Sequence, residues 1–411
     1  MRSIQKFNTI KPKIANFSYL DFNATTPPAE FLKTKVEDWL SLWGNPSSIH
    51  QAGRGPKTLL RESRSRIAKF IGAESLEVVF TSGGAEANNL AIKGVFEYAQ
   101  SHQSPRNEII ISSVEHPSLT KAALSLVNRG AKIHVLNVSR DGQIDLTQFK
   151  NILSEKTLLV SVMLANNETG SIFPVAEMAK LSHQYGALFH SDCVQALGKI
   201  ELNIKELGVD LASFAGHKFY ALKGAGLLYS ARGTNLQTQI YGGGQERSRR
   251  GGTENLLAIA SLAEMTAFKE DIVPQAMRIE AMRNFLEGEI LKQISGVQVT
   301  AQKNLRLPNT SSLVIDGVDG ETMLMNLDMR GFAASTGAAC SSGSPEPSPA
   351  LLAMGLTRSE AQSSLRIGLG WSTEESEVIN FISTLVKVVR HLRDIKNLKS
   401  RVYTKAEDLC V

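Results

Sequence analysis

Short apolar segments alternate with helix-length amphipathic segments along most of this sequence. This alternation is typical of strand–helix–strand units and predicts an α/β fold, in which helices cover both faces of a mostly parallel sheet. Because ligands bind at the carboxyl ends of the strands in such sheets, polar residues that directly follow a predicted strand are candidates for a functional site. The predicted strands are residues 77–81, 108–112, 132–136, 158–163, 187–190, 211–214 and 226–229, and the predicted helices between them include 86–99, 117–129 and 174–185.

The pattern changes after about residue 262, where helices predominate. A chain of 411 residues is long enough to divide into two domains. We therefore predict a large domain over residues 21–274 and a smaller α+β domain that combines residues 1–20 with residues 275–411. The elements predicted beyond the change are helices 262–294, 320–328 and 374–397 and strands 296–300 and 311–315.

Charge and apolar content argue against two classes of partner. The 45 basic and 40 acidic residues give a net charge of only +5 without a long basic block, which is not the pattern of a nucleic-acid-binding protein. No apolar run reaches the roughly 18 residues of a membrane helix, so we expect no membrane partner. The first 18 residues hold four basic and no acidic side chains, which faintly resembles an organelle presequence, but a short N-terminal extension is the favoured interpretation.

The cysteines Cys193, Cys340 and Cys410 have neither the spacing of a metal site nor the even number of a disulfide framework. We therefore expect a reducing compartment, the cytoplasm, and no metal site made by the protein alone. Cys193 ends a predicted buried strand and is expected in the core, whereas Cys410 is expected to be an exposed bystander. Cys340 lies among serines, glycines and alanines, so its thiol is expected to be accessible, as a reactive cysteine requires.

Lys218 and Asp192 follow or end predicted strands. A lysine shielded from water has a lowered pKa and can form a Schiff base with an aldehyde, although most lysines are solvated surface charges. Asp192 could pair with the protonated nitrogen of a pyridine ring, or it could merely cap a helix. Gln195 could donate a hydrogen bond to a phenolic oxygen on the same ring.

Two other segments extend this group. Residues 80–89 combine a strand, a glycine turn and a helix start, so backbone N–H groups around Gly84 and Ala85 could hold a phosphate. Many such turns only cap a helix. His116 follows the predicted strand 108–112 and could stack on a ring and move protons, although a single histidine is more often structural.

Taken in order with several other motifs, these segments resemble the cysteine desulfurases of the NifS/IscS group, which are pyridoxal-phosphate (PLP) enzymes of fold type I. The resemblance covers about residues 18–385, and its motifs are highly specific together although each is modest alone. The matching motifs are Tyr19–Pro27 (YLDFNATTP), Gly44–His50 (GNPSSIH), the glycine turn, Glu115–His116, Asn166–Glu168 (NNE), Asp192–Gln195 (DCVQ), Gly216–Lys218 (GHK), Gly242–Arg247 (GGGQER), Gly252–Asn255 (GTEN), the Cys340 segment and Leu365–Arg366.

The resemblance implies a role for each residue around the cofactor. Lys218 would hold PLP as a Schiff base. Asp192 would bind the pyridine nitrogen, Gln195 would bind the phenolic oxygen, and His116 would stack on the ring and act as acid and base. The phosphate would be bound by Gly84, Ala85 and His217, and Thr253 would reach the phosphate of a neighbouring subunit. The chain would therefore be a homodimer with shared sites.

The resemblance also implies the substrate and the reaction. Asn167 and Arg366 would bind the carboxylate of L-cysteine, and an arginine fork suits a carboxylate on physical grounds. Cys340 would take the substrate's sulfur as a persulfide, release L-alanine, and pass the sulfur to an acceptor or scaffold protein in iron–sulfur cluster assembly or another thiolation pathway.

Three positions differ from the common pattern of this family. Ala85 stands where a threonine usually follows the glycine turn, and Ala215 stands where serine is common. Each change removes a hydroxyl donor, so we expect weaker retention of the cofactor. Trp371 replaces a common arginine, for which the sequence offers no functional interpretation.

Two alternatives remain open at this point. A selenocysteine lyase or an aminotransferase of the same fold would share most of the motifs, but an aminotransferase would not need Cys340. A catalytically silent scaffold would not need Lys218, Asp192, His116 and Arg366 together.

Overall fold

The computed structural model describes residues 7–11, 17–337 and 346–407. Its strands are β1 (Ser18–Tyr19), β2 (Val78–Thr81), β3 (Glu108–Ser112), β4 (Lys132–Leu136), β5 (Thr157–Ser161), β6 (Leu188–Asp192), β7 (Leu211–Ala215), β8 (Gly226–Ser230), β9 (Val297–Val299), β10 (Thr310–Ile315), β11 (Phe332–Ala333) and β12 (Ser364–Gly368). Its α-helices are α1 (Leu32–Leu40), α2 (Gln51–Ile71), α3 (Gly84–Ser101), α4 (Pro117–Leu124), α5 (Leu146–Ile152), α6 (Val175–Gln184), α7 (Ile204–Leu207), α8 (Leu256–Met265), α9 (Ile272–Gln293), α10 (Gly320–Asp328), α11 (Pro349–Ala353), α12 (Arg358–Gln362) and α13 (Glu375–Glu407).

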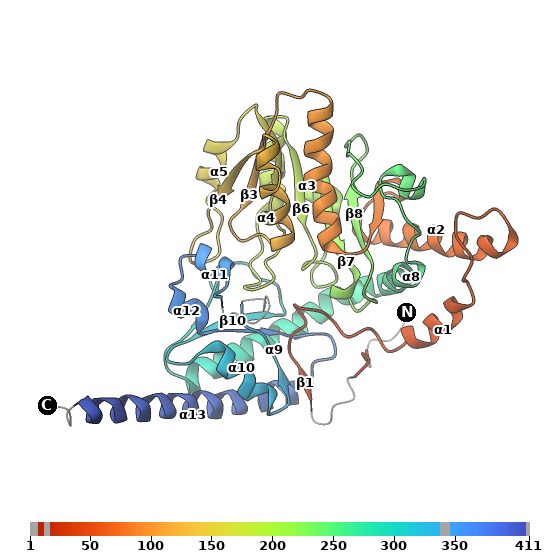
Figure 1. The fold of residues 1–411 in the computed structure, drawn as a ribbon. Helices are drawn as coiled ribbons and strands as arrows, with labels where there is room; N and C mark the ends of the chain where they lie inside the picture. The colour runs from red at the N-terminus through yellow and green to blue at the C-terminus, as the bar shows by residue number, and fades with distance from the viewer. Residues whose placement is uncertain (1–6, 12–16, 338–345, 408–411) are drawn as a thin grey trace.

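A seven-stranded sheet in the order β2-β8-β7-β6-β5-β3-β4 forms the centre of the structure (Figure 1). Strands β7, β6, β5, β3 and β4 pair in parallel, and β8 is antiparallel to both of its neighbours. Runs of β-branched and aliphatic residues such as EIIIS in β3 favour strands that are buried on both faces. The prediction of an α/β fold with a mostly parallel sheet is confirmed, and β3 and β4 match their predicted ranges residue for residue.

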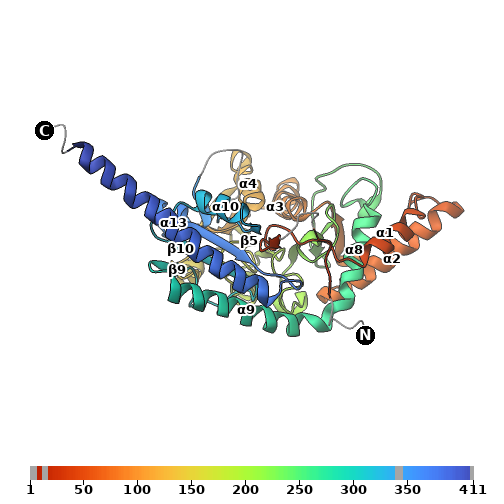
Figure 2. The ribbon, with the colours of Figure 1, turned by 90° about the horizontal axis from the view of Figure 1, so that it is seen from below.

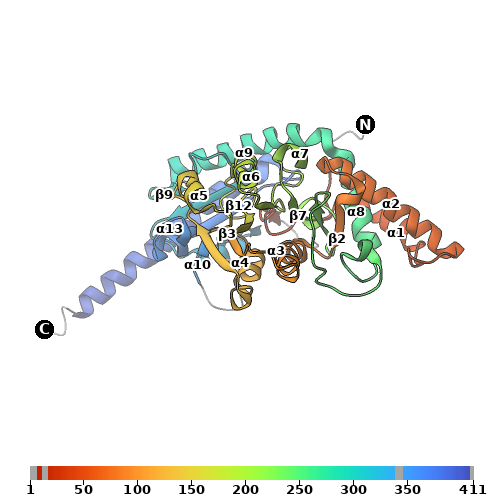
Figure 3. The ribbon, with the colours of Figure 1, turned by 90° about the horizontal axis from the view of Figure 1, so that it is seen from above.

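Successive side chains of each strand pack against different helices. Val79, Ile109 and Ile111 point toward the apolar residues of α3 and α4, whereas Ile110 and Val160 belong to the core shared with α6 and α7. Figure 3 shows α3 and α4 on one side of the sheet and α6 and α7 on the other. The period of two along each strand thus builds two apolar layers, one on each face.

The C-terminal third contains a smaller antiparallel sheet in the order β12-β10-β9. Helices α9 and α13 pack side by side beside this sheet, and the end of α13 extends away from the rest of the chain (Figure 2). The strands β1 and β11 pair in parallel, which joins the N-terminal segment to this part. The proposed division into residues 21–274 and residues 1–20 with 275–411 stays a prediction.

The predicted single helix over residues 262–294 is wrong. A 3₁₀ segment, η6 (Thr266–Asp271), separates α8 from α9, and Phe268 within it has a non-helical backbone. Phe268 is buried and contacts Phe7, Phe31 and Trp371. Packing of this aromatic cluster therefore interrupts a sequence that could otherwise continue as a helix. Within the described residues, no helix has the length and apolar character required to cross a membrane.

Candidate functional site

Asp192 ends β6 at the carboxyl edge of the large sheet, where the fold predicts a site. Its Oδ2 accepts a hydrogen bond from Asn88 Nδ2 at 2.8 Å, and its Oδ1 accepts one from the Val194 N–H at 3.0 Å. Asn88 Nδ2 also donates to the Ser118 hydroxyl at 3.0 Å, which lies 2.7 Å from His116 Nδ1. The carboxylate of Asp192 and the ring of His116 are therefore linked through α3 and the start of α4.

His116 is the N-cap of α4, and its Nδ1 accepts from the backbone N–H of Ser118 at 3.1 Å. A neutral ring with Nδ1 as an acceptor carries its proton on Nε2. Surrounding protein lowers the pKa of His116 through desolvation, the charge of Asp192 opposes this shift, and the charge of Lys218 adds to it. His116 is therefore held in a defined tautomer and is neutral at pH 7, a state able to accept a proton.

Lys218 lies in η4 (Gly216–Lys218), directly after β7 and next to Asp192's strand in the sheet. Its Nζ donates to the backbone oxygens of Asn23 and Ala24, both at 2.6 Å. Desolvation lowers the pKa of Lys218 to about 8, with a further contribution from the charge of Arg366, against the opposing charges of Asp21 and Asp192. A lysine with this pKa is an amine nucleophile near neutral pH.

Gln195 and His217 each contact the N-terminal segment between β1 and α1. Gln195 is buried, and its Nε2 donates to the Asn23 carbonyl at 3.0 Å, the same oxygen that Lys218 contacts. His217 Nδ1 lies 3.1 Å from the Thr25 hydroxyl, and desolvation lowers the pKa of His217 to about 4, assisted by the charges of Lys218 and Lys223. Both side chains are therefore held beside Lys218.

The N-terminus of α3 adjoins the end of β7. A Cβ added to Gly84, the first residue of α3, would lie 2.7 Å from Val194 and 3.7 Å from the Cβ of Ala215, whereas open space lies in front of Gly83. Ala85 is exposed in this first turn. The structure therefore places Ala215 against the first turn of α3, which also contains Ala85; these are the two positions that lack the expected hydroxyl groups.

Arg366 lies on β12 and is buried beside Asn167. One terminal nitrogen of Arg366 donates to the Asn167 backbone oxygen at 3.2 Å, and the other forms an ion pair with Asp21 at 2.8 Å. Its Nε is buried and has no hydrogen-bond partner among the described residues. Arg366 therefore retains an unused donor.

The residues that the structure brings together fit pyridoxal phosphate. A desolvated amine at Lys218 suits the aldehyde, the carboxylate of Asp192 suits the pyridine nitrogen, and the open turn at Gly83 and the start of α3 suit a phosphate. The unpartnered Oδ1 of Asn88, buried beside Asp192, leaves an acceptor available in this space. Thr253, in contrast, is exposed in the segment before α8.

One of the three cysteines lies in the core, and the other two lie outside the described residues. Cys193 is buried, and desolvation raises the pKa of its thiol. Cys340 and Cys410 lie outside the described residues. Beside the first of these segments, the Ser348 hydroxyl donates to Glu168, a side chain whose pKa desolvation raises to about 7 against the effects of Ser348 and Arg366.

Sequence reasoning missed Asn23, Asn88, Ser118 and Lys199. Asn88 lies within residues 80–89 and Ser118 within the predicted helix 117–129, but nothing in either segment indicates that they connect Asp192 with His116. Trp371 also gains an explanation: its ring packs in an aromatic cluster, and its backbone N–H donates to the Tyr220 hydroxyl at 2.6 Å. This packing explains an aromatic residue at that position.

Restoring two hydroxyl groups at the phosphate side is expected to tighten cofactor binding. A hydrogen bond to a charged group contributes about 1.5–3 kcal/mol, so Ala85→Thr with Ala215→Ser should lower the Kd for PLP by roughly tenfold or more. Equilibrium binding of PLP to the cofactor-free protein measures this change. Ala85→Val with Ala215→Ser is the control, because valine has the bulk of threonine without its hydroxyl group. A Kd that is unchanged in the double variant would contradict the prediction.

Glu115 is expected to make stability fall as the pH rises. It is buried with Oε2 unpartnered, and desolvation raises its pKa to about 8, while hydrogen bonds from Ser112 and Met163 lower it and Asp192 raises it. The folded state therefore holds a proton that the unfolded state releases above about pH 4.5. This group's stabilising contribution is complete below that pH, declines by up to about 1.4 kcal/mol per pH unit, and is lost above about pH 8.

Urea unfolding of the wild type and of Glu115→Gln between pH 5 and 9 measures this effect. The unfolding free energy of Glu115→Gln, relative to that of the wild type, should increase as the pH rises. The exposed control Glu155→Gln should show the same pH dependence as the wild type. Parallel pH curves for the wild type and Glu115→Gln would show that Glu115 does not titrate in this way.

Comparison with known proteins agrees with this geometry. The aminotransferase class-V family model matches residues 18–381. The cysteine desulfurase IscS of Dictyoglomus turgidum is 40% identical over 385 residues, which are 93% of this chain and 96% of that protein, and a cysteine desulfurase of Gluconacetobacter diazotrophicus is 38% identical over 387 residues, 92% of this chain and 95% of that protein.

Solved structures agree as well. A NifS-like protein aligns with a TM-score of 0.85 and 30% identity over 91% of this chain and 100% of its own, and a NifS-like protein from Rickettsia africae aligns with a TM-score of 0.81 and 34% identity over 90% of this chain and 99% of its own. The chain therefore belongs to the aminotransferase class-V family and, within it, to the cysteine desulfurases of the NifS/IscS group.

Proposed function

We propose that this protein uses pyridoxal phosphate to convert L-cysteine to L-alanine and keeps the sulfur as a persulfide on Cys340. The observation that carries the proposal is the desolvated amine of Lys218 beside the carboxylate of Asp192, in a chain of this family. Bound PLP would supply an electron sink for negative charge that develops on the substrate's α-carbon.

The side chains around Lys218 would then bind, orient and protonate. Lys218 would hold the cofactor covalently, Asp192 would keep a proton on the pyridine nitrogen, and Gln195 would donate to the phenolic oxygen. Neutral His116 would accept a proton at Nδ1 once Nδ1 no longer forms hydrogen bonds with Ser118, or it would donate a proton from Nε2. Gly84, Ala85 and His217 would contact the phosphate.

Arg366 and Asn167 would hold the substrate carboxylate. Arg366 has an unpaired Nε and lies against the backbone of Asn167, so an incoming carboxylate that binds Arg366 would lie close to residue 167. The ion pair of Arg366 with Asp21 keeps the guanidinium in place before substrate binds. Orientation by a fixed arginine fork reduces the entropy that binding must overcome.

Sulfur transfer balances as a displacement at the substrate's sulfur, with the β-carbon as the leaving group. The thiolate of Cys340 attacks the sulfur of L-cysteine, an S–S bond forms, and the substrate's C–S bond breaks. The electron pair left on the β-carbon takes up a proton, which yields L-alanine. An acceptor or scaffold protein, in iron–sulfur cluster assembly or another thiolation pathway, would then take the outer sulfur, and we propose the cytoplasm as the location.

We also propose a homodimer in which Thr253 reaches the partner's phosphate. Thr253 is exposed in the single chain, and several large apolar side chains are exposed as well. Trp43 and Ile49, which precede α2, have relative exposures of 81% and 92%, and Tyr241 has 74%. Exposed apolar surface of this kind is typical of an interface with another chain.

The test is release of alanine and sulfide from L-cysteine by PLP-loaded protein with a thiol reductant. Wild type is expected to release both in equal amounts, and Cys340→Ala neither, whereas the matched control Cys410→Ala should keep full activity. Equal activity in wild type and Cys340→Ala would contradict the persulfide and indicate elimination or transamination. Activity with selenocysteine alone would indicate a selenocysteine lyase.

A further inference from the structure

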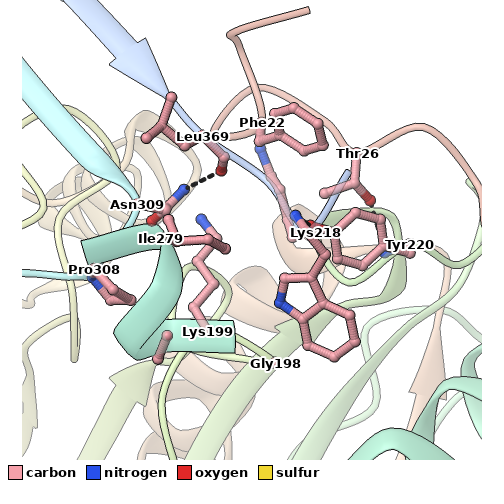
Figure 4. A pocket seen from close by; sticks show the side chains of 12 residues that line it. Phe22, Thr26, Gly198, Lys199, Lys218, Tyr220, Ile279, Pro308, Asn309 and Leu369 are labelled. Atoms are coloured by element: carbon pink, nitrogen blue, oxygen red, sulfur yellow. Dashed lines mark hydrogen bonds between the residues drawn. The ribbon is translucent and has the colours of Figure 1, made fainter. Parts of the chain in front are cut away.

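Lys199 is a second buried lysine near Lys218. Both line the same small cavity, together with Asn309 and Trp371 (Figure 4). The cavity measures about 10 Å³, which is space for about one water molecule, so Lys199 depends on protein atoms for its hydrogen bonds. Its Nζ donates to Gln195 Oε1 at 2.6 Å and to Asn23 Oδ1 at 3.2 Å.

This placement is costly for an amine. Desolvation lowers the pKa of Lys199 well below its usual value, the charges of Lys218 and Arg366 lower it further, and only Asp21 opposes them. Among the ion pairs of the described residues, none includes Lys199. The hydrogen bonds from Lys199 to Gln195 and Asn23 offset part of this cost.

The donors of Lys199 decide how the Gln195 amide is oriented. Lys199 Nζ donates to Gln195 Oε1, so the Gln195 oxygen faces Lys199 and the Gln195 NH₂ group faces the opposite side. There it donates to the Asn23 carbonyl at 3.0 Å, the atom that also accepts from Lys218 at 2.6 Å. The Asn23 carbonyl only accepts and favours the same orientation, so Lys199 and Asn23 together hold the amide, and loss of the Lys199 donor weakens this hold.

The backbone holds Lys199 close to the Lys218 segment. Gly198 has φ +71°, and a Cβ there would lie 1.9 Å from the ring of Phe219, the residue after Lys218. Only glycine therefore lets Phe219 pack against residue 198. The Asn23 side-chain oxygen is fixed as well, because it also accepts from Asn309 Nδ2 at 2.8 Å.

We propose that Lys199 is a positioning residue that keeps the N–H groups of Gln195 directed toward the phenolic oxygen of the cofactor. The inference rests on the proposed function only in that PLP occupies the site, and it is independent of what happens to the substrate's sulfur. A donor at the phenolic oxygen competes with the protonated nitrogen of cofactor-bound Lys218 for that oxygen. If this donor is lost, the phenolic oxygen should bind the proton on the Lys218 nitrogen more strongly, which raises the pKa of that nitrogen.

The experiment is a pH titration of the visible absorbance of the PLP-loaded protein without substrate. Lys199→Met is expected to raise the titration midpoint by about 1 pH unit, because one hydrogen bond to a charged group changes such an equilibrium roughly tenfold. Gln195→Ala should raise the midpoint similarly, and the double variant should show no larger shift than Gln195→Ala alone. Lys180→Met, at an exposed position of α6, should titrate like the wild type.

Each other outcome overturns the proposal. An unchanged midpoint in Lys199→Met shows that Lys199 does not orient Gln195, even if the melting temperature changes. Equal shifts from Lys199→Met with and without Gln195 show that it acts by charge alone. Lys199→Ala, which also removes the donor, gives the same test if the methionine variant does not fold.

The same titration separates this inference from the proposed function. A wild-type protein that binds PLP but forms no alanine from L-cysteine contradicts the proposed function and leaves the titration result valid. A wild-type protein that takes up no PLP overturns both.

Discussion

Replacing Lys218 with alanine is expected to reduce kcat for L-cysteine by roughly 10²–10⁴-fold or more, which is the scale for loss of a positioned acid–base group. The amine is held by two backbone oxygens and has a pKa of about 8, compared with 10.5 for an unperturbed lysine. At pH 7, roughly one molecule in ten would carry the neutral nucleophile, compared with roughly one in 3,000 for an unperturbed lysine.

The measurement should separate the loss of the amine from the loss of the charge. Lys218→Arg keeps a cation in the same place but cannot form a Schiff base, so it should lose the covalent cofactor and activity as Lys218→Ala does. Lys223→Ala, at an exposed position on the same loop, is the matched control and should keep both. Substantial activity in Lys218→Arg with covalently bound PLP would show that another residue is the nucleophile.

Breaking the ion pair between Arg64 and Glu246 is expected to destabilise the fold by about 3–5 kcal/mol, because one charge would remain buried without a partner. The guanidinium of Arg64, on α2, contacts both carboxylate oxygens of Glu246 at 2.7 and 2.5 Å. Glu246 is fully buried at its side chain, and one of its oxygens also accepts from the backbone N–H of Phe80 at 2.9 Å. The pair therefore joins α2 and β2 to the segment that leads to Thr253.

This segment also has an unusual backbone. Glu246, Arg247 and Ser248 have positive φ angles of 47°, 57° and 62°, a conformation that is unfavourable for residues other than glycine. The ion pair with Arg64 holds the first of them in place. Arg64→Met should therefore release the segment as well as lower the stability of the whole chain.

Urea unfolding measures the effect. Arg64→Met should lose about 3–5 kcal/mol, whereas Arg66→Met on the same helix, which breaks a more exposed pair with Glu264, should lose less than about 1 kcal/mol. Adding Glu246→Leu to Arg64→Met should recover part of the loss, because the unpaired charge is removed. A loss in Arg64→Met as small as in Arg66→Met would show that water reaches the Glu246 carboxylate.

The local sequence was sufficient to predict most strands and several side chains of the candidate site. Strand β3 and helix α10 have their predicted bounds, because an uninterrupted run of β-branched residues and an Asp319 N-cap are local signals. Asp192 and Lys218 were predicted as neighbours, because the ends of parallel strands meet at one edge of a sheet.

Contacts between distant segments decided the rest. Strand β12 was not predicted, because its residues become a strand only by pairing with β10. The break between α8 and α9 depends on aromatic packing around Phe268. The sequence by itself determined which chemistry the strand ends carry. Tertiary structure alone placed Asn88 against Asp192 and Lys199 against Asn23, because hydrogen bonds between residues 104 and 176 positions apart have no local pattern.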